Sequence, residues 1–249
     1  MLKTVLLDFD NTIYDDIGGI RRVFIQLRKE YRFFRQIPLD ELVTRFYFTD
    51  YGMREMIREE KMPVQEVNLH RTDLFLQGVG LPLKDSAVME IHERIRLLHI
   101  MYGKPIQGAN RFLKKLREKY TVGIVTNHMG DYQREKIEKS GFEDMIDFMI
   151  PAYDYGFFKP EPEIFSIALE MAGSTPEETV MIGDNWKADI IGAIQSGIVP
   201  IWANFKNQPP PEPGFTNVIR ALSPPGQIIE KIEYFHSLRP PVLKIDQDQ

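Results

Sequence analysis

The stretch LLDFDNTIYDD, residues 6–16, places two carboxylates directly after a run of strand-forming residues. Val5, Leu6 and Leu7 predict a buried strand, and Asp8 and Asp10 follow it with a single Phe between them. Two like charges this close raise the free energy of the folded chain unless a cation or a proton offsets them. The stretch therefore predicts a charged site at the end of the first strand.

The chain that follows this strand is patterned as helix. Apolar residues recur three and four apart between Ile20 and Phe34, and helical patterns continue near residues 39–60, 64–77 and 85–101. Residues 14–102 contain no stretch that predicts a strand. We therefore expect an all-helical domain inserted after the first strand.

From residue 103 onwards, predicted strands and helices alternate. Strands are expected at 121–126, 147–152, 179–183, 198–203 and 217–222. Helices are expected at 130–140, 159–172, 186–197 and 225–236, the third closed by Gly197. Several of these strands are apolar throughout, which indicates a parallel sheet covered on both faces. The sequence thus predicts an α/β fold: a Rossmann-like parallel sheet core from residues 1–13 and 103–249, with a helical cap domain from 14–102.

Composition narrows the possible functions. The 249 residues carry a formal net charge of −5 and no cysteine. This charge argues against a nucleic-acid partner, which would require a basic surface. Without cysteine, disulfides and thiolate chemistry are excluded, which favours a reducing, cytoplasmic location. No targeting segment or apolar run long enough for a membrane is visible, so we expect no membrane association.

Polar residues stand at the ends of other predicted strands as well. The strand at 121–126 ends in Thr126 and Asn127 comes next, and Asp184 follows the strand at 179–183, with Asp189 five residues further on. Lys159 lies at the start of a predicted helix, where prolines follow it. Ligands of open parallel sheets bind beyond the carboxyl ends of the strands, so we expect these residues to converge on one site.

The residue types at this site suit two neighbouring ligands. Asp8 and Asp184 offer the hard oxygen donors that Mg²⁺ prefers. Thr126, Asn127 and Lys159 offer hydrogen-bond donors and a positive charge for an anion. A cation site beside an anion site, without a Ser–His or Cys nucleophile, indicates phosphoryl transfer to a carboxylate.

Four motifs make this interpretation more specific. DFDNT, VTN, KPEPEIF and GDNWKAD resemble, in order and in structural context, the four motifs of the haloacid dehalogenase superfamily. The match spans roughly residues 1–13 and 103–222, and a helical insert directly after the first motif is similar to the C1-capped subgroup. That subgroup includes phosphoglycolate, sugar-phosphate, nucleotide and acylneuraminate phosphatases as well as haloacid dehalogenases.

The resemblance implies a role for each residue of the first motif and of the lysine motif. Asp8 is similar to the nucleophile that becomes an aspartyl-phosphate, and it also binds Mg²⁺. Asp10 is similar to the acid and base of the reaction, with its backbone carbonyl on the metal. The negative charge of Asp8 is expected to help Asp10 hold a proton for the leaving group. Lys159 would offset charge on the phosphoryl group. Thr12 would contact the site residues and not the substrate.

The other two motifs supply phosphate and metal contacts in the resemblance. Thr126 and Asn127 would hold the transferring phosphoryl group. Asp184 resembles the second carboxylate ligand of Mg²⁺. Asp189 resembles a carboxylate that supports this site, and a direct contact between Asp189 and the metal is left open.

Asp10 separates the possible chemistries. Dehalogenases of this superfamily lack an acid at this place because a halide leaves without a proton, whereas an alkoxide needs one. The sequence therefore favours a phosphomonoesterase acting on a small phosphorylated metabolite, such as a sugar phosphate, a nucleoside monophosphate or phosphoglycolate. The alternatives are a dehalogenase-type hydrolase, a receiver-like protein that stores phosphate on Asp8, and a catalytically silent scaffold. The physiological substrate and the oligomeric state are left open.

Overall fold

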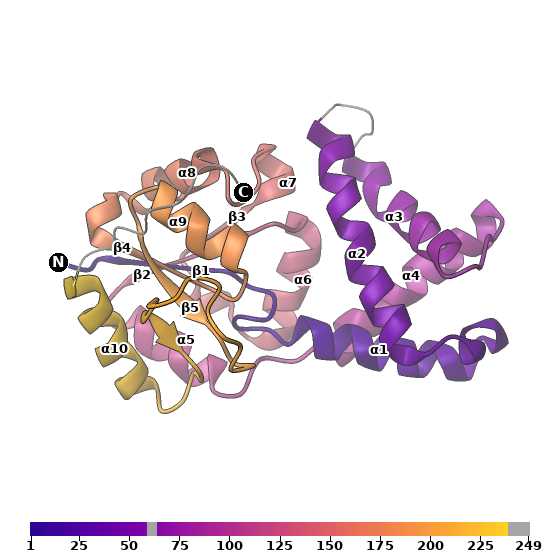
Figure 1. The fold of residues 1–249 in the computed structure, drawn as a ribbon, viewed down its shortest axis with the longest axis horizontal. Coiled ribbons are helices and arrows are strands. Elements are labelled where there is room, and N and C mark those ends of the chain that lie inside the picture. The colour runs from indigo at the N-terminus through magenta and orange to yellow at the C-terminus, as the bar shows by residue number, and fades with distance from the viewer. Residues whose placement is uncertain (59–63, 239–249) are drawn as a thin grey trace. The chain divides into compact units, whose positions relative to one another are not determined.

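The structure, a computed structural model, describes residues 1–58 and 64–238. The chain separates into two units, Met1–Tyr14 with Pro105–Gln249 and Asp15–Lys104 (Figure 1). The sequence expectation places the corresponding boundaries at 13/14 and 102/103. The end of the helix expected at 39–60 and the polar tail after residue 238 lie outside the described residues.

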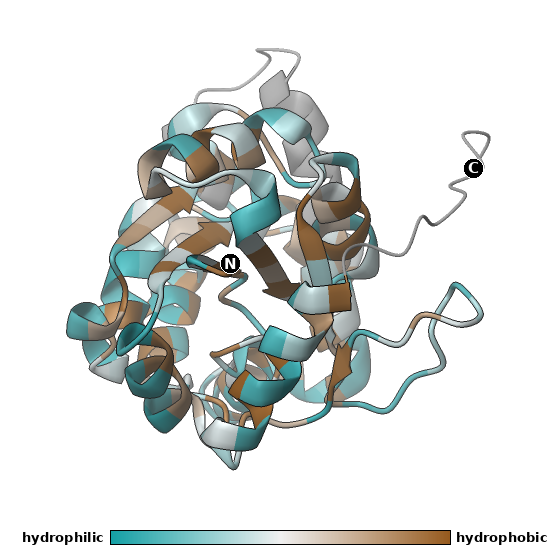
Figure 2. Ribbon diagram, turned by 90° about the vertical axis from the view of Figure 1, so that its left-hand side faces the viewer, coloured by the Kyte–Doolittle hydropathy of each residue, from teal (hydrophilic) through white to brown (hydrophobic). Residues whose placement is uncertain are grey.

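The first unit is built on one sheet of six parallel strands in the order β3-β2-β1-β4-β5-β6. The strands are β1 Thr4–Leu7, β2 Thr121–Thr126, β3 Phe148–Pro151, β4 Thr179–Gly183, β5 Val199–Ala203 and β6 Val218–Ile219. All residues of β1, β4 and β5 are buried, as expected of a sheet covered on both faces. Figure 2 shows the strands in the brown of hydrophobic residues. The predicted α/β fold with a parallel sheet is thus confirmed.

Helices cover both faces of this sheet (Figure 1). Their bounds are α5 Ala109–Arg117, α6 Gly130–Ser140, α7 Ala152–Tyr155, α8 Pro162–Ala172, α9 Gly192–Gln195 and α10 Pro225–Leu238. Helices α5 and α10 lie along one face, where Phe112 and Ile232 pack with Leu7 and Ile124 in one fully buried cluster. Helices α8 and α9 lie along the other face.

The register of the strands brings the residues that follow β1, β2 and β4 to one edge of the sheet. Leu7 pairs with Ile124 of β2 and with Ile182 of β4. The backbone N–H of Asp8 continues this pattern and donates to the carbonyl of Ile182 at 2.9 Å. The residues that follow β1, β2 and β4 therefore emerge side by side, as the strand-end argument expected.

Three elements differ from the sequence expectation. The helix expected at 159–172 begins only at Pro162, so that Lys159 precedes it. The helix expected at 186–197 begins as a π-helical turn, Trp186–Ile191, and continues as the short α9. Gly197 closes it as predicted, in the left-handed region at φ 72° that favours glycine. The strand expected at 217–222 is shortened to β6 because only Val218 and Ile219 pair with the end of β5.

The second unit is all-helical within its described residues. It contains α1 Asp16–Glu30, a 3₁₀ turn Arg32–Gln36, α2 Leu39–Arg58, α3 Val64–Gly78 and α4 Asp85–Tyr102. The stripe predicted from Ile20 to Phe34 lines its core, in which Phe24 packs against Phe34, Phe46 and Phe75. Among the described helices of both units, none combines the length and the hydropathy needed to cross a membrane.

Candidate active site

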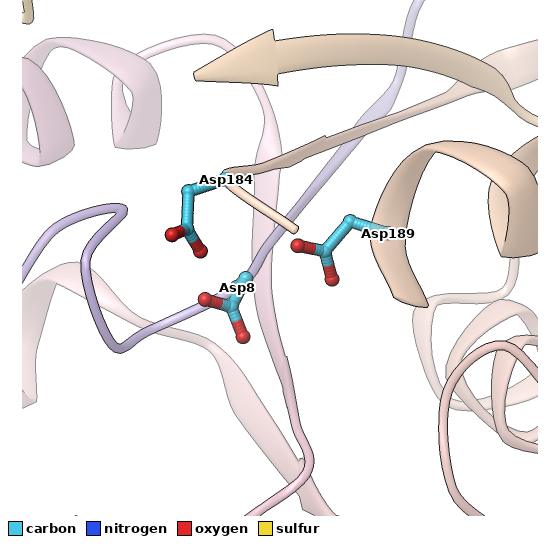
Figure 3. A group of neighbouring side chains, drawn as sticks. All are labelled: Asp8, Asp184 and Asp189. Atoms are coloured by element: carbon cyan, nitrogen blue, oxygen red, sulfur yellow. The ribbon is translucent and has the colours of Figure 1, made fainter. Parts of the chain in front are cut away.

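Three carboxylates converge where β1 and β4 end. Asp8 follows β1, Asp184 follows β4, and Asp189 lies in the π-helical turn Trp186–Ile191. One carboxylate oxygen of each lies within 4.8 Å of the other two. Figure 3 shows the three side chains turned toward a common region. The strand-end argument therefore predicted the right neighbours.

A buried lysine joins two of these carboxylates. The Nζ of Lys159 donates to Oδ1 of Asp8 and to Oδ1 of Asp189, both at 2.7 Å, and the lysine is 3% exposed. The second oxygen of Asp189 accepts from the backbone N–H of Asn185 at 2.9 Å. Both oxygens of Asp189 are thus engaged by protein donors. In this arrangement Asp189 holds Lys159 and the loop after β4 in place.

The local backbone explains how Asp189 reaches the site. A π-helical turn is wider than an α-helical one, and here it begins at the side-chain cap that Asn185 forms with the N–H of Ala188 at 2.9 Å. The turn brings the carboxylate of Asp189 against the backbone of Gly183, where an added Cβ would lie 2.2 Å from Cγ of Asp189. Position 183 therefore accepts only glycine while Asp189 keeps this place.

Burial and mutual repulsion disfavour the charged forms of two of the carboxylates. Burial raises the pKa of Asp8 from 3.8 to about 6, although the Lys159 ammonium opposes this shift. Burial, and then the charges of Asp8 and Asp189, raise the pKa of Asp184 well above 3.8. Burial alone would lower the pKa of Lys159, but the charges of Asp189 and Asp8 raise it. Three carboxylates and one ammonium leave a formal charge of −2 when all are ionised.

This charge and the donor set fit a divalent cation. Within the described part of the chain, no hydrogen bond or ion pair reaches the carboxylate of Asp184. An unpartnered carboxylate of raised pKa beside Asp8 is a suitable ligand for a hard cation such as Mg²⁺. The backbone of Asp184 is held in place by Trp202, whose Nε1 donates to the carbonyl of Asp184 at 2.9 Å. The residues present therefore fit the predicted metal.

The loop after β1 bends sharply to bring Thr12 back to Asp8. Asn11 has a φ of 65°, a left-handed conformation that asparagine tolerates better than most residues, and its N–H donates to the carbonyl of Tyr14 at 2.6 Å. The hydroxyl of Thr12 then donates to Oδ2 of Asp8 at 3.3 Å. Thr12 thus contacts Asp8 from within the protein.

The last residue of β2, Thr126, and the residue after it, Asn127, differ in what their side chains do. Thr126 is 2% exposed and its Oγ1 accepts from Gln133 Nε2 at 2.9 Å. The side chain of Asn127 pairs with the backbone of Lys159, donating from Nδ2 at 2.8 Å and accepting on Oδ1 at 2.7 Å. Asn127 therefore positions Lys159, and one N–H of its amino group together with its backbone remain for an anion. The sequence assigned Asn127 only the second of these tasks.

Asp10 lies against helix α6, which sequence reasoning did not connect with the site. Its Oδ1 accepts from Lys136 Nζ and its Oδ2 from Gln133 Nε2, both at 2.7 Å. The ammonium of Lys136 favours the ionised form of Asp10, whereas the negative charge of Asp8 favours the protonated form. A signal was present in the sequence, since Gln133 and Lys136 lie three residues apart on the predicted helix and share a face with the apolar Ile137.

The raised pKa values predict how metal-free stability responds to pH. The folded state holds protons on Asp8 and Asp184 more tightly than the unfolded state does. Protonation of these two carboxyl groups therefore stabilises the folded state. This stabilisation is complete below the pKa of the unfolded state and is lost as the pH rises through the pKa of the folded state. Between about pH 7.5 and pH 5.5 these two groups are expected to add about 1–3 kcal/mol to the free energy of unfolding. Urea titration in EDTA at both pH values measures this change.

Histidines titrate in the same pH range and also change the free energy of unfolding. The variant Asp184→Asn separates the contribution of Asp184 from theirs. It lacks one of the two groups, so its stability should increase less than that of the wild type when the pH falls. An equal pH response in the two proteins would contradict the assignment of the raised pKa to Asp184.

A parallel sheet with a carboxylate cluster at the ends of its central strands, and a buried lysine beside it, defines an α/β protein with an acidic site whose donors fit a divalent cation. The chain belongs to the haloacid dehalogenase-like hydrolases, whose pattern it matches over residues 5–203. It is 34% identical to pyrimidine 5′-nucleotidase YjjG of Escherichia coli over 109 residues, 43% of this chain and 48% of that protein. It is 30% identical to phosphoserine phosphatase of Thermus thermophilus over 230 residues, 82% of this chain and 89% of that protein.

Solved structures agree with this assignment. Magnesium-bound HAD-hydrolase YfnB from Bacillus subtilis superposes with a TM-score of 0.74 at 25% identity, covering 92% of this chain and 99% of that one. Dehalogenases also share the fold, at 14% to 22% identity, a likeness that shows the fold alone. The predicted superfamily is therefore confirmed, and a nucleotidase from the predicted branch is among the relatives.

Proposed function

We propose that this hydrolase is a Mg²⁺-dependent phosphomonoesterase that acts on a small phosphorylated metabolite. The observation that carries the proposal is Asp10, an acid two residues beyond the carboxylate that Lys159 contacts. A departing halide needs no proton, whereas a departing alkoxide does, and a positioned acid contributes roughly 10²- to 10⁴-fold. Relatives that cover most of this chain are phosphatases, which supports the same class.

The reaction would begin at Asp8. Its carboxylate oxygen attacks phosphorus, the bond between phosphorus and the ester oxygen breaks, and Asp10 gives its proton to that leaving oxygen. The products of this step are an alcohol, an aspartyl-phosphate on Asp8 and an ionised Asp10. Burial beside Lys159 keeps the attacking carboxylate out of bulk water and in a fixed orientation.

Water would complete the cycle. Asp10 takes a proton from a water molecule as its oxygen attacks phosphorus, and the bond between phosphorus and Asp8 breaks. Inorganic phosphate leaves, and Asp8 is again a carboxylate and Asp10 again an acid. Asp10 therefore has to serve as acid and then as base within one turnover.

The remaining residues would bind and orient. Thr126, Asn127 and Lys159 would contact the oxygens of the phosphoryl group, while Asp8, Asp184 and the backbone carbonyl of Asp10 would hold Mg²⁺. A bound Mg²⁺ would offset the negative charge of the cluster and polarise the phosphoryl group. We further infer that the helical unit Asp15–Lys104 serves as a cap that excludes bulk water during the reaction.

A panel of phosphate esters tests this function. Purified protein should release phosphate from 4-nitrophenyl phosphate and from at least one metabolite in Mg²⁺, and EDTA should abolish the release. The panel should contain a nucleoside monophosphate, phosphoserine and glyceraldehyde 3-phosphate, the substrate classes named for its relatives. It should also contain phosphoglycolate, a sugar phosphate and, for the dehalogenase alternative, 2-chloropropionate.

The outcomes separate the alternatives. Chloride release without phosphate release would establish the dehalogenase alternative. A phosphoryl group that stays on Asp8 for minutes would favour the receiver-like alternative, and a protein inactive on every compound would favour the silent scaffold. Each of these results contradicts the phosphomonoesterase.

A further inference from the structure

Helix α6 presents two polar side chains to the interior of the first unit. Gln133 and Lys136 lie one turn apart, and both are completely buried. Burying a lysine or a glutamine is unfavourable unless its polar atoms find partners. Their hydrogen-bond partners lie outside the helix, on Asp10 after β1 and on Thr126 at the end of β2.

The ammonium of Lys136 is directed at Asp10 and enclosed by aromatic rings. It lies 2.7 Å from Oδ1 of Asp10, 5.2 Å from the ring centroid of Tyr14 and 4.9 Å from that of Tyr132. Cations over aromatic faces are stabilised by the ring quadrupole. These contacts restrict the ammonium to one place, so one oxygen of Asp10 has a fixed position while its side chain remains 15% exposed.

Gln133 connects Asp10 with Thr126. Its Nε2 lies 2.7 Å from Oδ2 of Asp10 and 2.9 Å from Oγ1 of Thr126, so both hydrogens of the amino group are used. A hydroxyl that accepts a hydrogen bond keeps its own hydrogen for another partner. The hydroxyl of Thr126 is therefore oriented as a donor, as an anion would require.

The amide of Gln133 holds this orientation although one of its atoms lacks a partner. Its Oε1 is buried and has no hydrogen-bond partner among the described residues. A buried acceptor without a partner is unfavourable, so this orientation is maintained by the two bonds of the amino group. If Gln133 only filled space in the core, nothing would favour this orientation of its amide.

We propose that Lys136 and Gln133 are positioning residues that hold Asp10 for proton transfer and turn the hydroxyl of Thr126 toward the phosphoryl group. Lys136 acts on Asp10, and Gln133 acts on both Asp10 and Thr126. The inference rests on the proposed phosphomonoesterase and deepens it, because it assigns the orientation of the acid to a helix outside the four sequence motifs. Its consequence is that both residues matter most when the leaving group needs a proton.

Leaving groups of graded acidity test this consequence. The value of kcat/KM is measured in Mg²⁺ for 2,4-dinitrophenyl, 4-nitrophenyl and phenyl phosphate, because kcat/KM reports the step in which the ester bond breaks. The proteins are the wild type, Lys136→Met, Gln133→Met, Asp10→Asn as the benchmark, and Lys139→Met as the control. Lys139 is exposed on the same helix, so its replacement removes a charge without touching Asp10.

We expect Lys136→Met to lower kcat/KM for phenyl phosphate by about 10- to 100-fold, and that for 2,4-dinitrophenyl phosphate by less than about threefold. Gln133→Met should show the same dependence and also raise KM for every ester, since Thr126 loses its orientation. Lys139→Met should match the wild type. Thermal unfolding of each variant checks its fold, and Gln133→Met tests the proposal even where Lys136→Met does not fold.

Two results would overturn the inference while leaving the proposed function intact. One is an equal loss on all three esters in both variants, which indicates a structural role. The other is wild-type behaviour of both variants while Asp10→Asn shows the steep dependence. A wild-type protein that cleaves none of the esters in Mg²⁺ overturns the proposed function, and the inference with it.

Discussion

Replacement of Asp8 by Asn is expected to reduce Mg²⁺-dependent phosphate release by at least about 10³-fold. The amide keeps the size of the side chain but lacks the carboxylate oxygen that attacks phosphorus. It also removes the negative charge opposite Lys159, whose Nζ lies 2.7 Å from Oδ1 of Asp8, and leaves only a neutral amide oxygen as acceptor. Phosphate release from the most reactive ester of the panel, measured under saturating Mg²⁺, gives the size of the loss.

A matched variant separates this loss from a general effect of removing a carboxylate. Asp144→Asn makes the same chemical change at an exposed position in the turn Glu143–Met145 and should keep wild-type activity. Incubation with substrate should also leave Asp8→Asn without the acid-stable, alkali-labile phosphate that an aspartyl-phosphate would give the wild type. Undiminished release from Asp8→Asn would rule out Asp8 as the nucleophile.

Replacement of Lys159 by Met is expected to lower the free energy of unfolding by about 3–5 kcal/mol in the absence of metal. The lysine is buried between Asp8 and Asp189, and its removal leaves two buried carboxylates without the cation that both contact. An uncompensated buried charge is more unfavourable than the loss of the pair itself. Urea unfolding in EDTA at neutral pH measures the effect.

Two further proteins make this stability measurement specific. Lys231→Met removes a lysine from an exposed position on α10 and should change stability by less than about 0.5 kcal/mol. The double variant Asp8→Asn with Lys159→Met removes both partners and should recover part of the loss, since one buried carboxylate is gone. If Lys159→Met is as stable as Lys231→Met, the ion pair contributes nothing measurable to the fold.

Much of the fold could be predicted because its elements are specified locally. The strand at 121–126 and the helix at 130–140 have the predicted ends. The strand is a short apolar run and the helix ends before Gly141, and such signals depend on neighbours within a few positions. The proximity of Asp8 and Asp184 was also predictable, because parallel strands bring their carboxyl ends to one edge.

The departures arise where a distant contact outweighs the local pattern. The π-helical turn at Trp186–Ile191 places Asp189 against Gly183 and within reach of Lys159. The energetic reason for a wider turn lies in these contacts, which no helical periodicity records. The side chain of Asn127 likewise pairs with the backbone of a residue 32 positions away.

The sequence by itself determined the family, the polar residues that stand at the ends of the strands, and the acidic pair Asp8 and Asp10. These features depend on residue type and short-range spacing. Only the tertiary structure decided what surrounds Asp10. Lys136 and Gln133 are more than 120 residues away in the chain, and their polar atoms meet Asp10 because α6 packs beside the loop after β1. A buried lysine requires an anion, and which anion it finds depends on packing rather than on the sequence near it.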